Sequence, residues 1–324
     1  MPRRPLVLDS DPGLDDAAAL HYLLARPEWE LLAYTAVGGN VPVDLTFRNA
    51  RALAAAFGID HDVPVYRGAG RPISRVPIGG DFHGASGLGS AELPDSAVPE
   101  QQSLAPLELL RLSHVYENEL TVVATGPLTN IAAALILDPE FARRVAHLVF
   151  MGGAALVPGN ITSVAEFNIW ADPDAADLVV ASGIPYTMVG LDVTHHAPLT
   201  ADDVAKIDAA GTDHARLTAA LLRDYLNAYL TFTGRDHGFL HDPLAIGVAS
   251  DESFAEVRTG CVVVGTDLGL HRGQTVFIPD DAAQTPFLTE ATRARTAVKG
   301  NVAVAPGRSL FPADFVSRLR QPLQ

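Results

Sequence analysis

Near its start the chain carries the run Leu6-Val7-Leu8-Asp9-Ser10-Asp11-Pro12-Gly13-Leu14-Asp15-Asp16-Ala17-Ala18-Ala19-Leu20. Its apolar beginning predicts a short buried strand, Pro12 and Gly13 predict a tight turn, and the remainder predicts a helix. Four aspartates therefore gather at the carboxyl end of one strand. Carboxylates this close repel one another, so a site that keeps them ionised normally contains a cation. Oxygen donors suit Ca²⁺ or Mg²⁺ and not a thiophilic metal.

Ordinary structural roles explain some of these aspartates. Aspartate is a preferred helix N-cap, Asp-Pro and Pro-Gly are common in turns, and acidic residues in a first helical turn complement the helix dipole. None of these roles requires Asp9, Asp11, Asp15 and Asp16 within one loop. The spacing also differs from the EF-hand loop, in which alternating ligands lead to a glycine and a distant glutamate. We therefore favour a metal site.

The composition is that of a large, acidic folded protein. Its 324 residues are 48% hydrophobic, enough for one big α/β domain or two smaller ones. The net charge of −15 argues against nucleic acid or an anionic membrane as a partner. Cys261 stands alone in an apolar run and is expected in a buried strand. Because no run is long enough for a signal region or a membrane span, we expect a soluble cytoplasmic protein.

Strands and helices alternate along most of the chain. Apolar runs predict strands at 30–37, 63–66, 120–124, 147–151 and 185–189, and amphipathic segments predict helices at 44–57, 105–117 and 172–182. This alternation predicts an α/β fold with a mostly parallel open sheet flanked by helices, a Rossmann-like core. Additional helices are expected in the C-terminal half, including a long one over 213–233 that places Tyr225 and Tyr229 on one face.

The polar segments of this pattern follow the predicted strands. Clusters at 9–16, 38–40, 125–130 and 151–153 all stand at strand ends. Ligands of open parallel sheets bind outside the carboxyl ends of the strands, so we expect these clusters to line one crevice. The loop 68–103, rich in Gly, Pro and Ser, is typical of a mobile flap over a site.

Two further polar clusters lie in the second half. If Glu166, Phe167 and Asn168 are extended, Glu166 and Asn168 point the same way, which suits hydrogen bonding to adjacent hydroxyls. Taken alone, this segment is more often a solvated loop anchored by Phe167. His241-Asp242-Pro243 taken alone is a helix N-cap followed by proline, with an ordinary histidine before it.

Together these segments resemble the inosine-uridine preferring nucleoside hydrolase family along nearly the whole chain. The resemblance rests on the aspartate run joined to Gly38-Gly39-Asn40, Thr125-Gly126-Pro127-Leu128-Thr129-Asn130, Met151-Gly152-Gly153, Glu166-Phe167-Asn168 and His241-Asp242-Pro243. Leu191-Asp192-Val193-Thr194 and Arg272-Gly273-Gln274-Thr275-Val276 also resemble family segments. The resemblance implies one domain over residues 1–324 that hydrolyses ribonucleosides to base and ribose in nucleoside salvage, as a homodimer or homotetramer.

The resemblance also implies a role for each matching residue. The side chains of Asp11, Asp16 and Asp242 and the main-chain carbonyl of Thr125 would bind one Ca²⁺. Asp15 would be the general base toward a water held by the ion. His241 would assist the leaving base, and Asn168 completes the catalytic set. The substrate would contact Asn40, His83, Met151, Asn160, Glu166, Phe167, Asn168 and Tyr229.

The chemistry of glycosidic cleavage agrees with these roles. The reaction passes through an oxocarbenium-like state, whose positive charge nearby carboxylates stabilise. Ca²⁺ lowers the pKa of a bound water less than Zn²⁺ does, so a carboxylate base such as Asp15 is still needed. Histidine titrates in a range useful for helping the departing base. Direct attack by water would invert the configuration at the sugar carbon.

Other functions fit less well. A Mg²⁺-dependent phosphohydrolase also clusters aspartates at a strand end, but such sites usually hold a lysine, an arginine or a glycine-rich phosphate cradle. The polar clusters at the strand ends contain no lysine or arginine. A non-catalytic nucleoside-binding protein would not need Asp15 and His241. The preferred base stays open between an inosine-uridine type and a pyrimidine-specific type.

Overall fold

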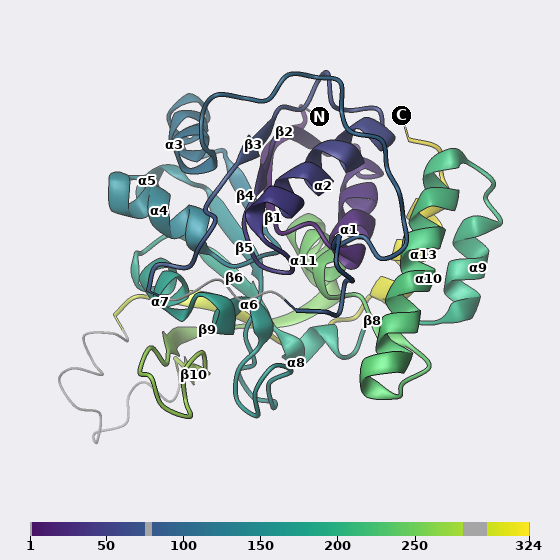
Figure 1. Ribbon diagram of the computed structural model, residues 1–324. Helices are drawn as coiled ribbons and strands as arrows, with labels where there is room; N and C mark the ends of the chain where they lie inside the picture. Colours follow the sequence, from purple (N-terminus) through teal and green to yellow (C-terminus); the bar gives the residue numbers. More distant parts are fainter. Residues whose placement is uncertain (1, 75–79, 281–296, 324) are drawn as a thin grey trace.

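The computed structural model describes residues 2–74, 80–280 and 297–323. Within them a nine-stranded sheet has the strand order β10-β9-β11-β6-β5-β4-β1-β2-β3 (Figure 1). The strands are β1 Arg4–Ser10, β2 Trp29–Ala36, β3 Val65–Arg67, β4 Thr121–Ala124, β5 His147–Met151, β6 Tyr186–Val189, β9 Ala255–Val264, β10 Thr275–Pro279 and β11 Gly300–Pro306. All neighbours from β3 to β11 are parallel, whereas β9 pairs antiparallel with both β11 and β10. The predicted α/β fold with a mostly parallel sheet is confirmed.

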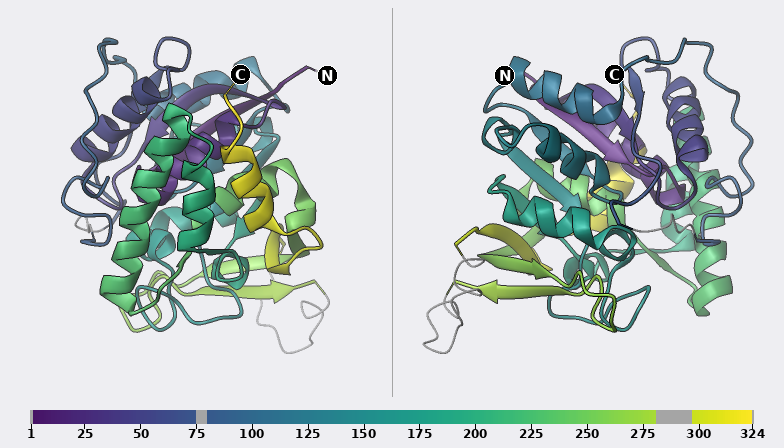
Figure 2. Two further views of the ribbon diagram at one scale, coloured as in Figure 1. Left: turned by 90° about the vertical axis from the view of Figure 1, so that its right-hand side faces the viewer. Right: turned by 60° about the vertical axis from the view of Figure 1, so that its left-hand side comes forward.

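Helices cover both faces of the sheet (Figures 1 and 2). Side chains of β1 alternate between two cores, with Leu6 and Leu8 in one and Val7 in the other. The first core packs under α1 Leu14–Leu24, α2 Val43–Ala56, α8 Leu191–Thr194, α9 Ala201–Asp208, α10 Asp213–Thr233, α11 His241–Ser250 and α13 Phe311–Leu319. The second core packs under α3 Ala105–Val115, α4 Thr129–Leu137, α5 Phe141–Arg144, α6 Phe167–Ala171 and α7 Pro173–Ala181. Parallel strands buried on both faces read as continuous apolar runs, which is why they were predictable.

Small elements complete the fold. A separate two-stranded sheet joins β7 Pro198–Leu199 to β8 Gly238–Phe239, and the 3-10 turn η1 Glu252–Phe254 precedes β9. Cys261 lies buried in β9, as its apolar neighbours predicted. Among the described helices, none combines the length and apolarity needed to cross a membrane.

The order of the strands fixes where a ligand can bind. The chain winds from β1 through β2 to β3 on one side of the sheet, and from β4 through β5 to β6 on the other. The direction of winding therefore reverses between β1 and β4, and a crevice opens outside the carboxyl ends of such strands. Asp9 of β1 pairs in register with Ala124 of β4. The loops that begin at Asp11 and Thr125 consequently lie side by side at this point.

Two local expectations are wrong. The segment Glu166 to Asn168 is not extended throughout, because α6 begins at Phe167. Glu166 is the N-cap of α6, and its carboxylate accepts hydrogen bonds from the backbone N–H of Asn168 at 2.8 Å and Ile169 at 3.2 Å. Asp242 is not an N-cap, because α11 already begins at His241. Its carboxylate therefore does not cap α11, and it lies beside Asp16 instead.

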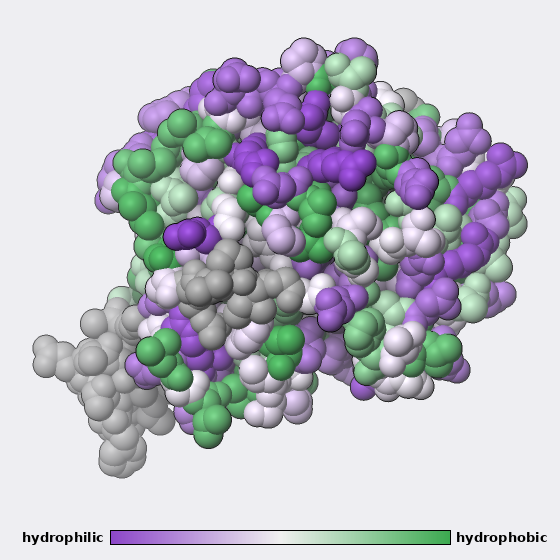
Figure 3. Space-filling view, viewed as in Figure 1, coloured by the Kyte–Doolittle hydropathy of each residue, from purple (hydrophilic) through white to green (hydrophobic). Residues whose placement is uncertain are grey.

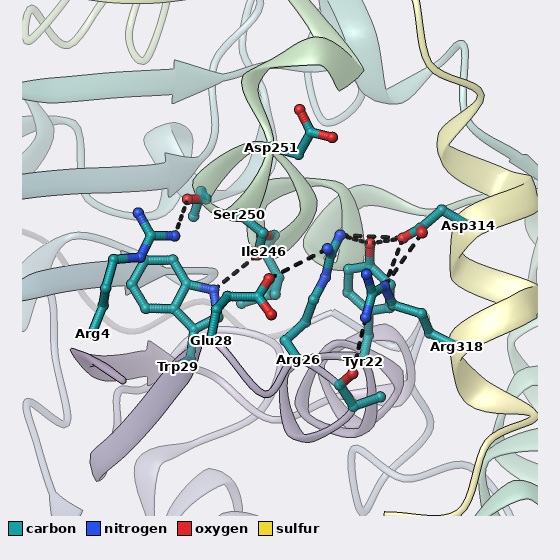
Figure 4. A network of polar contacts seen from close by, with 12 residues as sticks. Arg4, Tyr22, Arg26, Glu28, Trp29, Ile246, Ser250, Asp251, Asp314 and Arg318 are labelled. Atoms are coloured by element: carbon teal, nitrogen blue, oxygen red, sulfur yellow. Dashed lines mark hydrogen bonds and ion pairs between the residues drawn. The ribbon is translucent and has the colours of Figure 1, made fainter. Parts of the chain in front are cut away.

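The C-terminal helix is fastened to α1 by a polar network at the amino ends of the strands (Figure 4). The Arg26 guanidinium is only 4% exposed and donates to Asp314 of α13 at 3.2 Å. The hydroxyl of Tyr22 and the guanidinium of Arg318 donate to the same carboxylate, at 2.5 Å and 3.2 Å. Buried charge is stable here because it is paired. This network holds the end of the sheet that lies opposite the crevice.

Candidate active site

Four buried aspartates meet at the crevice between β1 and β4. Asp15 and Asp16 lie in the first turn of α1, and Asp242 lies in the first turn of α11. Carboxylate oxygens of these three residues all lie within 4.8 Å of one another. Asp11, in the loop after β1, has its backbone and side chain buried beside them. Helices α1 and α11 pack together, and this packing brings the carboxylates into one group.

Asp16 is the most strongly held member of the group. One carboxylate oxygen, Oδ1, accepts hydrogen bonds from the hydroxyls of Ser10 at 2.8 Å and Thr125 at 2.9 Å. The other, Oδ2, accepts the Gly13 N–H at 2.9 Å and an Asn40 amide N–H at 3.3 Å. The bond to Gly13 also closes the N-terminus of α1. These four donors fix the orientation of the Asp16 carboxylate.

The other aspartates carry an unfavourable charge that calls for a cation. Burial, reinforced by the charge of Asp16, raises the pKa of Asp11 well above its usual value and raises the pKa of Asp15 to about 8. Burial and the neighbouring aspartates likewise raise the pKa of Asp242. Oδ1 of Asp11 is buried without a hydrogen-bond partner in the described part of the chain. A buried carboxylate oxygen without a hydrogen-bond partner, surrounded by other oxygen ligands, suits the binding of a hard divalent cation.

Asn168 and Glu166 border the aspartates on the side of β5. The Asn168 amide donates to the main-chain carbonyls of Thr125 at 2.9 Å and Met151 at 3.2 Å. The Glu166 carboxylate accepts the N–H of Gly153 at 2.9 Å. Burial raises the pKa of Glu166 to about 7. The start of α6 thus ties together the loops that follow β4 and β5.

Asn40 reaches the aspartates from the loop after β2, whereas Asn160 and Phe167 lie at the periphery. The Asn40 backbone N–H donates to Asp11 at 2.7 Å, and its side-chain amide donates to the Asp11 carbonyl at 3.0 Å. Asn160 is exposed, and its side-chain oxygen accepts the Phe167 N–H at 3.0 Å. Phe167 is half-buried, with its ring beside Trp170. No contact among the described residues joins Asn160 or Phe167 to the carboxylates.

Two histidines face the aspartates from opposite segments. His83 Nδ1 accepts the Leu14 N–H at 3.0 Å and lies 3.9 Å from Asp15, so the proton of a neutral His83 ring stands on Nε2. His241 lies between two hydroxyls, with Nε2 2.9 Å from Tyr229 Oη. Burial lowers the pKa of His83 to about 4 and that of His241 to about 3. Both rings are neutral at physiological pH.

Tyr225 is a residue of the site to which the sequence assigned no role. Its hydroxyl donates to the Phe239 carbonyl at 2.6 Å and lies 3.3 Å from Oδ2 of Asp15. The spacing of Tyr225 and Tyr229 predicted one shared face, and both rings are buried on the side of α10 that faces the aspartates. Phe82, next to His83, packs edge-on against Tyr229 with ring centroids 5.2 Å apart. An aromatic wall therefore lines this side.

Asp9 does not belong to the cluster, although the sequence places it in the same run. Its side chain alternates to the opposite face of the sheet from Ser10. There its Oδ1 accepts hydrogen bonds from Thr35 at 2.6 Å and Asn130 at 2.7 Å. The Asn130 side-chain oxygen in turn accepts the Ala69 N–H at 2.8 Å. Asp9 thus joins β2 to α4, and Asn130 in turn holds the loop after β3.

Comparisons with known proteins point to one enzyme family. The family model for inosine-uridine preferring nucleoside hydrolases matches residues 6–305. A pyrimidine-specific ribonucleoside hydrolase RihA from Citrobacter koseri is 40% identical over 247 residues, which cover 75% of this chain and 77% of the relative. A solved plant nucleoside hydrolase matches with TM-score 0.91 and 31% identity, covering 99% of this chain and 100% of its own. A purine-preferring ribonucleoside hydrolase from Gardnerella vaginalis matches with TM-score 0.88 and 33% identity over 98% of each chain.

Proposed function

Because this chain belongs to the inosine-uridine preferring nucleoside hydrolase family, and is thus an N-glycosidase, we propose that it splits ribonucleosides into base and ribose with the aspartate cluster as its catalytic centre. The observation that carries this proposal is the group formed by Asp15, Asp16 and Asp242, whose carboxylate oxygens lie within 4.8 Å of one another. Three buried carboxylates are costly unless a cation joins them.

The proposed cofactor is one Ca²⁺. Asp11, Asp16 and Asp242 would hold it with their side chains, and Thr125 with its main-chain carbonyl. The free Oδ1 of Asp11 supports this set. When bound, such an ion lowers the pKa of a coordinated water and grips the ribose diol.

Asp15 is the proposed general base. Burial and the charge of Asp16 make its carboxylate a stronger base than that of a free aspartate, which suits a group that takes a proton from water. Oδ2 of Asp15 lies 3.3 Å from the Tyr225 hydroxyl, which orients the carboxylate. Water activated by Asp15 attacks the anomeric carbon, and the bond to the base breaks.

The ribose would lie against Asn40, Asn168 and Glu166, which surround the aspartates. Asn168 contributes to catalysis by fixing the sugar beside the carbonyls of Thr125 and Met151. Carboxylates and oriented dipoles around the ring stabilise the positive charge that develops on the sugar. Asn160 and Phe167 would complete the sugar side from the periphery.

The base would face His241, His83 and Tyr229. The leaving base develops negative charge, and neutral side chains that donate hydrogen bonds stabilise it. None of the described side chains that hydrogen-bond in this site is a lysine or arginine, so it suits an uncharged nucleoside better than a phosphate ester.

We propose that both inosine and uridine are cleaved, as the family description suggests. The pyrimidine-specific relative at 40% identity favours a second candidate, in which only pyrimidine nucleosides react. Assembly as a homodimer or homotetramer, a cytoplasmic location and a place in nucleoside salvage stay predictions.

Ribose release from inosine, guanosine, adenosine, uridine and cytidine tests the proposal. We expect release from uridine and inosine with Ca²⁺ present and none after exhaustive chelation, with recovery when Ca²⁺ is returned. Release from uridine and cytidine alone would select the pyrimidine-specific candidate. Release that survives chelation would contradict the metal role, and no release from any nucleoside by folded, Ca²⁺-loaded protein would overturn the proposed substrate class.

A further inference from the structure

The family segment Leu191-Asp192-Val193-Thr194 has no part in the function described so far. It forms the short helix α8, which lies between β6 and the start of α11. Asp192 accepts the backbone N–H of Ala155 at 2.9 Å and Leu156 at 2.7 Å, and so holds the loop after β5. Thr194 is completely buried, and its hydroxyl lies 2.8 Å from Nδ1 of His241. The far side of the catalytic histidine is thus in contact with α8.

Two hydroxyls bracket the His241 ring, and a neutral ring carries one proton. Either Nδ1–H donates to Thr194 and Nε2 accepts from Tyr229, or Thr194 donates to Nδ1 and the proton stands on Nε2. In the first arrangement the Thr194 O–H is buried without an acceptor, because it has no second hydrogen-bond partner among the described residues. A buried donor without a partner costs about 1–3 kcal/mol. In the second arrangement Nε2–H donates to the Tyr229 oxygen, and the Tyr229 O–H can turn to the neighbouring Tyr225 hydroxyl, which itself donates to the Phe239 carbonyl. The second arrangement therefore leaves no hydroxyl unpartnered and is favoured, and a departing base takes the place of Tyr229 at Nε2.

We propose that Thr194 is a positioning residue, which donates to Nδ1 of His241 and so keeps an N–H on Nε2 for the departing base. This inference rests on the proposed function. An Nε2–H offers a hydrogen bond to the negative charge that forms on the base, whereas a bare Nε2 lone pair repels it. The second nitrogen of a histidine commonly fixes the tautomer of the first in this manner.

Two substrates with different leaving groups distinguish this positioning role from a purely structural one. Uracil leaves poorly as an anion and needs the hydrogen bond, whereas p-nitrophenolate is stabilised by its nitro group and leaves without help. A variant that has lost the Nε2–H should therefore be slow on uridine and normal on p-nitrophenyl riboside. A variant with a disturbed sugar or metal site should be slow on both.

Thr194→Val is the decisive variant, because valine keeps the shape and removes the hydroxyl. Loss of one oriented hydrogen-bond donor lowers kcat by about 10²–10³-fold. Because Thr194 acts through His241, we expect Thr194→Val to lower kcat on uridine by about tenfold or more. We expect kcat on p-nitrophenyl riboside to change by less than about threefold, because p-nitrophenolate needs no hydrogen-bond donor to leave. Thr194→Ser restores the hydroxyl and should bring uridine turnover back toward wild type.

The chain supplies a matched control. Thr218 of α10 is also completely buried, and its hydroxyl lies 2.8 Å from Nδ1 of His21, two helical turns before Tyr225. Thr218→Val removes the same kind of hydrogen bond and should leave the ratio of the two rates unchanged. In a His241→Ala background, adding Thr194→Val should lower uridine turnover little further, because Thr194 acts only through His241.

The outcomes distinguish this inference from the proposed function. Wild-type protein that cleaves neither substrate overturns the proposed function itself. If wild type cleaves both, equal losses on the two substrates in Thr194→Val make Thr194 structural, and no loss on uridine removes it from the mechanism. Failure of Thr194→Ser to recover while Thr194→Val remains folded would also overturn the inference.

Discussion

Asp15 and Asp242 lie in the same carboxylate group, yet their loss should have different effects. Asp15→Asn removes the proton acceptor but leaves the proposed ligands, so turnover at saturating Ca²⁺ should fall by at least about 10²-fold. Its Ca²⁺ affinity, measured by calorimetry, should stay within a few-fold of wild type. Preserved turnover would remove Asp15 as the base.

Asp242→Asn should show the reverse pattern. Removing one charged ligand should weaken Ca²⁺ binding by about tenfold or more, and raising the Ca²⁺ concentration should recover part of the activity. Calorimetric titration with Ca²⁺ measures the first effect, and ribose release at several Ca²⁺ concentrations measures the second. An unchanged affinity would reject Asp242 as a ligand.

The role of a residue was predictable where local structure alone does not explain that type of side chain at that position. Asp11, Asp15 and Asp16 stand out because a single turn needs no such group of carboxylates. Thr194 and Tyr225 could not be assigned, because a buried threonine or tyrosine is ordinary in a core and their hydroxyls meet His241 and Asp15 only after the chain folds. Contacts between segments so distant in sequence leave no local pattern.

Whole elements were predictable in proportion to their length and periodicity. The buried strands of the parallel part gave continuous apolar runs, and α10 gave a long helical period. The helix α6 has five residues, too few for a period, and so its segment was expected to be irregular or extended. The antiparallel pairing of β9 with β10 and β11 depends on tertiary context. The proposed flap over 68–103 includes residues 75–79, which lie outside the described residues.

The attachment of α13 to α1 yields a stability prediction. Asp314→Ala would leave the buried Arg26 guanidinium with only the more exposed Glu28 carboxylate, at 3.4 Å, as a charged partner, which should cost about 1–3 kcal/mol of unfolding free energy. Adding Arg26→Met should recover part of this loss, because the incompletely paired buried charge then disappears. Urea unfolding curves of the two variants measure both effects. A double variant less stable than Asp314→Ala alone would contradict this account.

An exposed ion pair provides the control for this prediction. Arg48 and Asp95 form a bridge at 2.7 Å in which both side chains are more than half exposed, at 58% and 69%. Solvent screens such pairs, so Asp95→Ala should leave the free energy of unfolding nearly unchanged. A cost equal to that of Asp314→Ala would show that burial of Arg26 is not the source of the effect.

At the scale of the whole molecule, the expected homodimer or homotetramer is a prediction about which part of the surface becomes buried. Hydrophilic side chains dominate the side formed by α9 and α10, and apolar ones gather over α3 and α4 (Figure 3). These two helices carry Val115, Ile136 and Leu137, each 59% exposed. Light scattering would measure the expected homodimer or homotetramer directly.

The buried acids of the whole chain link its stability to pH and to the cation. Burial raises the pKa of Asp15 to about 8 and that of Asp9 and Glu166 to about 7, above their usual values of 3.8 and 4.5. From pH 7 to 8 these acids therefore bind more protons in the folded chain than in the unfolded chain. Their contribution makes the free energy of unfolding fall as pH rises through this window. The buried histidines, whose pKa values are lowered, oppose this trend near pH 6.5, where the unfolded chain still protonates them, and lose their effect at higher pH.

We accordingly expect the Tm of the chelated protein to fall between pH 7 and 8.5. Ca²⁺ should bind more tightly as pH rises, because protons compete with it for the same carboxylates, and the Tm shift that it causes should grow over the same range. Calorimetric scans with chelator and with excess Ca²⁺ at each pH measure both trends. In Asp242→Asn the Ca²⁺-dependent shift should shrink at every pH. A shift larger at pH 7 than at pH 8.5 would mean that these carboxylates are already ionised without the cation, and that the ion binds elsewhere.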